Sequence, residues 1–109
     1  MYGMIEYNIT KKVVEKYFGI KIDDLRDKIR IEKSDVAAFN TFCYILVKVY
    51  NKTLKEVSGN TGKTEMRISQ AVSWVCSLDC EIMKDNLILN RIDNCKREVL
   101  FLEGTTNLK

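Results

Sequence analysis

Residues 53–75 read TLKEVSGNTGKTEMRISQAVSWV, and this stretch decides how the fold is interpreted. It opens with the T-x-x-E pattern of a capping box, which predicts a short helix over 54–58. A turn over 59–63 contains two glycines, and a longer helix is predicted to begin at Thr64. This order of helix, turn and helix is typical of a helix-turn-helix unit, with a plain helical hairpin as the alternative.

The start of the second helix supplies candidate DNA-binding residues. In a helix-turn-helix unit this end of the second helix enters the major groove of DNA. There Thr64 would bond a phosphate, Arg67 would take guanine and Gln70 would pair with adenine. Lys63 would meet the DNA backbone. The helix is predicted to run past Cys80.

The same stretch contains Gly62-Lys63-Thr64, which ends like a nucleotide-binding P-loop. The first glycine of that motif is replaced by Val57, however, and a P-loop must follow a buried strand. The preceding residues 52–56 are polar and carry the helix cap instead. We therefore interpret the match as accidental.

Apolar residues at helical spacing predict helices before this unit as well. One covers 10–18 and stops at Gly19, and a short one follows around 23–26. Ser34 is predicted to cap a long central helix, about 35–51, which is apolar on nearly every side and therefore buried. The terminal segments, 1–9 and 104–109, are predicted to be loose ends.

A heptad seam follows the central unit. It consists of Ile88, Ile92, Cys95, Val99 and Leu102. The seam favours a helix over 84–103, and the alternative is a β-hairpin with strands at 87–91 and 98–103. Packing on the protein's own core is favoured over pairing with a second copy or a host replication protein through Ile88, Ile92, Val99 and Leu102.

The chain as a whole is therefore predicted to be all-α, a compact domain of five to six helices spanning 1–109. Its helix-turn-helix core would occupy 10–82. With 109 residues it has room for one core, and 46% apolar with 30% charged residues is typical of a globular protein.

Composition excludes several functional classes. The absence of histidine removes Ser-His-Asp catalysis and His-containing zinc sites, so we expect no enzyme, no cofactor and no metal. The longest apolar run, 42–47, is far shorter than the ~20 residues of a membrane span, and no secretory signal is visible, so a cytoplasmic protein is expected. The four cysteines are interpreted as small buried hydrophobes, ahead of disulfides or a four-cysteine zinc site.

Charge is unevenly placed along the chain. Residues 1–67 carry thirteen Lys and Arg against nine Asp and Glu, whereas residues 68–109 carry five against six. A basic first part suits an anionic partner such as nucleic acid, and a merely solvated charged surface is the alternative.

The order of parts resembles the C-terminal DNA-binding domain of the bacterial replication initiator DnaA, over about residues 12–82. The matching positions are Val14, Tyr17, Phe18, Ile20, Asp24, Leu25, Arg26, Lys28, Arg30, Tyr44, Leu46, Leu54, Glu56, Val57, Gly62, Lys63, Ile68 and Ala71. The resemblance implies a Trp-repressor-like helical fold, with a basic loop that grips phosphates and the minor groove. That role falls on Lys28, Arg30 and Lys33.

The resemblance also implies that a recognition helix reads DNA through Lys63, Thr64 and Arg67. This chain has Thr64-Glu65-Met66-Arg67 where the family has an Asp-His-Thr-Thr-like stretch. It has Glu32, Asp35, Val36 and Ala37 where the family's loop continues rich in arginine. The DNA box of the family is therefore not its expected target, and the resemblance does not extend to the family's ATPase domain.

Two functions are expected from these observations. The first is a small, non-enzymatic protein that binds double-stranded DNA, as a replication or transcription regulator of a phage or mobile element. The second is a protein-interaction module that keeps the scaffold without binding DNA, because Glu32, Asp35 and Glu65 on the expected DNA face would each repel phosphate.

Overall fold

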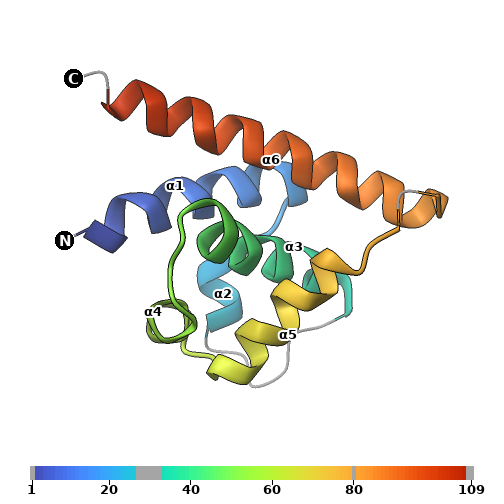
Figure 1. The fold of residues 1–109 in the computed structure, drawn as a ribbon, viewed down its shortest axis with the longest axis horizontal. Helices are drawn as coiled ribbons and strands as arrows, with labels where there is room; N and C mark the ends of the chain where they lie inside the picture. Colours follow the sequence, from blue (N-terminus) through green and yellow to red (C-terminus); the bar gives the residue numbers. More distant parts are fainter. Residues whose placement is uncertain (1, 27–32, 80, 108–109) are drawn as a thin grey trace.

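The computed structural model describes residues 2–26, 33–79 and 81–107, and every regular element in them is a helix. In chain order the elements are α1 (Tyr2–Phe18), α2 (Ile22–Arg26), α3 (Lys33–Tyr44), η1 (Ile45–Val49), α4 (Leu54–Thr61), α5 (Glu65–Cys76) and α6 (Met83–Asn107). Helices α1 and α6 lie side by side along one edge, α4 and α5 lie on the opposite side, and α3 runs between them (Figure 1). The all-α prediction is confirmed.

Helix α3 and the π-helical turn η1 form the predicted central rod, which spans residues 33–49. Phe39, Phe42 and Leu46 along it are at most 1% exposed. Ser34, the predicted cap, already lies inside the helix, so the helix begins slightly earlier than expected. Because this rod contacts both α1 and α5, it fixes how the two sides of the molecule are placed.

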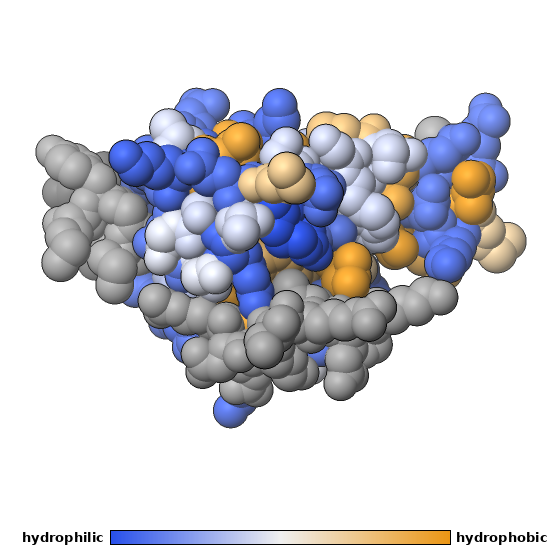
Figure 2. Space-filling view, turned by 90° about the horizontal axis from the view of Figure 1, so that it is seen from below, coloured by the Kyte–Doolittle hydropathy of each residue, from blue (hydrophilic) through white to orange (hydrophobic). Residues whose placement is uncertain are grey.

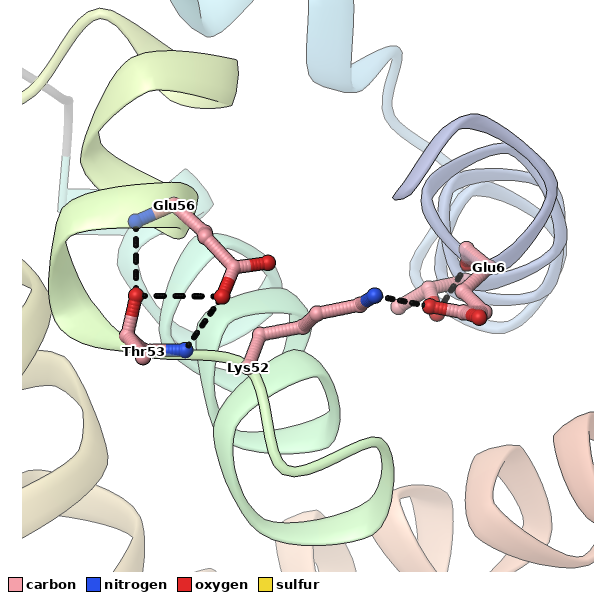
Figure 3. A network of polar contacts seen from close by, with 5 residues as sticks. Glu6, Lys52, Thr53 and Glu56 are labelled. Atoms are coloured by element: carbon pink, nitrogen blue, oxygen red, sulfur yellow. Dashed lines mark hydrogen bonds and ion pairs between the residues drawn. The ribbon is translucent and has the colours of Figure 1, made fainter. Parts of the chain in front are cut away.

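Helix α1 is longer than predicted, because residues 2–9 are helical rather than loose. The Tyr7 ring packs edge-on against Phe42 with centroids 5.2 Å apart. Glu6 forms an ion pair with Lys52, which follows η1 (Figure 3). These contacts with distant residues hold the first turns, and the helix ends as predicted at Gly19, in the left-handed conformation with φ 71°.

The C-terminal segment is one helix, so the hairpin alternative is wrong and the helix prediction is confirmed. It continues to Asn107, beyond the predicted end at 103. Ile92, Cys95 and Val99 are buried, and the helix packs along α1. Two side chains of α1, those of Lys16 and Tyr17, bond Glu98 on α6 at 2.9 and 3.0 Å.

Candidate nucleic-acid interface

Helix α4 continues to Thr61, so the predicted turn over 59–63 is reduced to Gly62 and Lys63, and caps define it at both ends. The capping box is present: the Glu56 amide donates to Thr53 Oγ1 at 3.1 Å, and the Glu56 side chain accepts from the Thr53 amide (Figure 3). Gly62 ends α4 at φ 72°, and Thr64 begins α5 by accepting from the Arg67 amide at 3.1 Å. Gly62-Lys63-Thr64 is therefore a C-cap, a turn residue and an N-cap.

The backbone of Lys63 is held from both sides. The Lys63 amide donates to Thr61 Oγ1 at 3.3 Å, and the Lys63 carbonyl accepts from the Ser58 hydroxyl. Thr61 in turn donates to the Val57 carbonyl at 2.8 Å and is buried. The turn thus presents the half-buried Lys63 at a fixed place beside the start of α5.

One face of α5 packs against α3. Ile68, Ala71 and Val75 are at most 4% exposed, and this packing sets the roll of the helix about its axis. The helix ends at Cys76, short of the predicted end beyond Cys80. There the Ser77 hydroxyl donates to the Trp74 carbonyl at 2.7 Å and the Ser77 amide closes the last turn. Such local side-chain bonds compete with further helix.

Arg67 belongs to the packed side of α5. Its guanidinium donates to Asn40 Oδ1 on α3 at 3.0 Å and lies 4.8 Å from the centroid of the Phe39 ring. Asn40 is only 2% exposed, so this bond satisfies a buried amide oxygen. Burial raises the pKa of the nearby Cys43 thiol, and the Arg67 charge opposes that rise only in part. The guanine contact predicted for Arg67 would require it to leave α3.

The opposite face of α5 is exposed and polar. It carries Glu65, Met66, Ser69, Gln70 and Ser73, and the Met66 side chain is 71% exposed. Helix α4 adds the exposed Lys55 in its first turn. The side of the molecule that holds α4 and α5 is mainly hydrophilic, with apolar residues gathered toward the end where α6 begins (Figures 1 and 2).

The predicted site residues are only partly brought together. Lys63, Thr64 and Gln70 lie in and after the turn, at the start of α5. Lys28 and Arg30, with the acidic Glu32, lie outside the described residues. Lys33 is the first residue of α3, and its side chain also lies outside the described part. The predicted convergence of loop and helix therefore stays a prediction.

Sequence reasoning missed Met66, Ser69 and Lys55. Met66 and Ser69 each lie two residues before a buried residue, Ile68 and Ala71 respectively, and so on the side of the helix away from the buried stripe. Helical periodicity could have found them, and it could also have found the inward position of Arg67, which lies one turn before Ala71. Lys55 follows directly from the confirmed capping box, as an exposed residue of the capped turn.

The cysteines agree with the predicted packing role where they are buried. Cys43 and Cys95 are both fully covered, and burial raises the pKa of Cys95 to about 12. Cys76 is exposed at the end of α5, so the buried packing role predicted for it is wrong, and Cys80 lies outside the described residues. Within the described residues, no three His, Cys, Asp or Glu side chains gather in a group that could hold a metal ion.

The heptad seam of α6 is buried in part within the molecule. Ile92 and Val99 are 3% and 0% exposed, and α6 packs along α1, which agrees for these two residues with the favoured prediction that the seam packs on the protein's own core. Near the start of α6 a separate opening of about 560 Å³ is lined by Met83, Lys84, Leu87, Ile88 and Arg91. Met83 and Leu87 are 81% and 63% exposed there.

Among the described helices, none has a stretch both long and apolar enough to cross a bilayer. Comparisons with protein-family models, with curated proteins and with solved structures each give no match. The resemblance to the DnaA domain thus rests on the residues quoted for it and on nothing else.

Proposed function

We propose that this protein binds double-stranded DNA without catalysing a reaction, and that the exposed face of α5 is its contact with the major groove. The observation that carries the proposal is the division of α5 into two faces. One face, with Arg67 and Ile68, is anchored on α3, while Glu65, Met66 and Gln70 on the other face are exposed. A helix that enters the major groove must be held rigidly by the rest of the protein, and it must present a polar face that is accessible to DNA.

Cations elsewhere in the chain would supply most of the affinity. Lys63 stands in the turn and Lys55 in the first turn of α4. Lys28, Arg30 and Lys33 would add to them from the predicted basic loop. Phosphate contacts of this kind supply the sequence-independent part of DNA binding and make it sensitive to salt.

The proposed setting follows the resemblance to the DnaA domain. It is a cytoplasmic regulator of replication or transcription, encoded by a phage or mobile element. Neither the DNA box nor the ATP-dependent activity of an initiator is part of the proposal, because the reading residues differ at 64–67.

The direct test is a fluorescence-anisotropy titration of a random-sequence duplex at several salt concentrations between about 50 and 200 mM. With about five phosphate contacts, log K should fall with log salt at a slope near −4 to −5. Lys63→Ala and Lys55→Ala should each reduce the slope by about 1. Lys84→Ala on α6 is the matched control and should leave it unchanged. Absence of binding at low salt, or binding that ignores salt, would refute the proposal.

A second candidate function, a protein-interaction module, is favoured by the opening at the start of α6. Its exposed Met83 and Leu87 are the kind of apolar surface that marks protein contacts. If the duplex is not bound and the protein sediments as a dimer that Leu87→Asp converts to a monomer, this function replaces DNA binding.

A further inference from the structure

From the exposed face of α5 we infer that this helix reads A·T base pairs, with Met66 against a thymine methyl group and Gln70 on the neighbouring adenine edge. The inference rests on the proposed DNA binding and adds which bases are recognised. It starts from the chemistry of the exposed side chains, Glu65, Met66, Ser69, Gln70 and Ser73, none of which is a Lys or Arg.

Guanine is the base that this face is least suited to read. The commonest specific contact to guanine in the major groove is a bidentate Arg or Lys. The arginine of this helix, Arg67, is engaged with Asn40 at 3.0 Å and with the Phe39 ring, on the packed side. A guanine contact would therefore leave the buried Asn40 oxygen without its partner.

Met66 is the least expected residue on a solvated face. It is 71% exposed in the first turn of α5. In the major groove the only apolar group on a base edge is the C5-methyl of thymine. Contact with that methyl would bury apolar surface on both partners, which accounts for an exposed methionine at this position.

Gln70 lies on the same face, one helical turn after Met66. A glutamine can bond the N6 and N7 atoms of adenine at once. Four residues advance about 6 Å along a helix, which is close to two base-pair steps. The two contacts therefore fall within about three consecutive base pairs.

Glu65 contributes to the sequence preference of this face and not to its affinity for the DNA backbone. It is exposed beside Met66, and its carboxylate can accept a bond from cytosine N4 but repels phosphate. The reading face thus carries a negative charge, and the proposal assigns the phosphate contacts to Lys63, in the turn before α5, and to Lys55, in the first turn of α4. Loss of a reading residue should change which sequences are preferred without removing binding to the random pool.

The test is a selection from a randomised duplex pool, followed by substitution of single atoms in the selected DNA. We expect two A·T pairs within about three positions. Replacing the critical thymine by uracil, which lacks the methyl, should weaken binding by about three- to five-fold. Replacing the adenine by 7-deaza-adenine should weaken it by about five-fold or more.

The matched variants assign each effect to a residue. Met66→Ala should lose the sensitivity to uracil and keep that to 7-deaza-adenine, whereas Gln70→Ala should do the reverse. Lys84→Ala, on the exposed start of α6 and outside this face, should keep both. All three positions are exposed, so each variant should fold and still bind the random pool.

The outcomes distinguish failure of the A·T inference from failure of the proposed DNA binding. If the pool is bound in a salt-dependent way but the selected motif is G·C-rich, or Met66→Ala stays sensitive to uracil, the A·T inference is wrong and DNA binding stands. If no duplex is retained at low salt, the proposed function fails and the inference fails with it.

Discussion

Two glycines of the α4–α5 unit have opposite roles. Gly62 has φ 72°, a conformation that costs an L-residue about 1 kcal/mol or more, whereas Gly59 lies inside α4 with open space where a Cβ would be added. Gly62→Ala should lower the free energy of unfolding by about 1 kcal/mol, and Gly59→Ala should raise it by about 0.5–1 kcal/mol. Urea denaturation of the two variants checks this, and shifts of the same sign would contradict the description of the turn.

Arg67 is a brace between α5 and α3. Arg67→Ala would leave the buried Asn40 oxygen without its bond and remove the contact with the Phe39 ring. We expect a loss of about 2 kcal/mol in the free energy of unfolding. Gln70→Ala, on the exposed face of the same helix, is the control and should change it by less than about 0.5 kcal/mol. Equal effects of the two variants in urea titrations would show that Arg67 is not a brace.

At the scale of elements, the contact between α1 and α6 is internal. Val99 is 0% exposed, and Val99→Ala should lower the free energy of unfolding by about 2 kcal/mol. Because the partner helix belongs to the same chain, the midpoint of thermal unfolding should not change over about a hundred-fold range of protein concentration. A midpoint that rises with concentration would show that α6 pairs between chains after all.

The contact between α1 and α6 also includes polar bonds to Glu98, and their contribution to stability depends on pH. The Lys16 ammonium, helped by the Tyr17 hydroxyl, holds the pKa of Glu98 below its ordinary value of 4.5. A lowered folded-state pKa stabilises the fold above the unfolded value, and this stabilisation is lost as pH falls through the folded value.

Glu98→Gln should therefore be less stable than the natural chain at neutral pH, and the difference should close as the pH falls below 4.5. Thermal unfolding measured across this range checks the sign. A difference that stays constant down to strongly acidic pH would show that the Glu98 charge plays no part.

Structural features that depend on neighbouring residues could be predicted from the sequence. Those that depend on contacts with residues far away in the sequence could not. The capping box at Thr53 and Glu56 and the stop at Gly19 depend on neighbouring residues, and both are present. The first turns of α1 depend instead on contacts such as that of Tyr7 with Phe42, more than thirty positions away in the sequence. The sequence of residues 2–9 by itself gives no sign of such a contact.

At the scale of the whole molecule, the candidate site was predicted in position but not in composition. The turn before α5 and the place of Lys63, Thr64 and Gln70 follow from helix signals. The inward turn of Arg67 follows from how α5 rolls against α3, which is set by the packing of Ile68 and Ala71. Charge and residue type alone indicated that Arg67 reads bases. This prediction failed to place Arg67 inward because charge and residue type contain no information on the roll of α5 about its axis.

The central claim is that the exposed face of α5 enters the groove of a DNA duplex. Chemical-shift mapping of the ¹⁵N-labelled protein during titration with the selected duplex tests it most directly. We predict that the largest amide shifts fall between Lys63 and Gln70, with the start of α6 unaffected. Shifts that gather instead at Met83, Leu87 and Arg91, or no shifts at low salt, would contradict it.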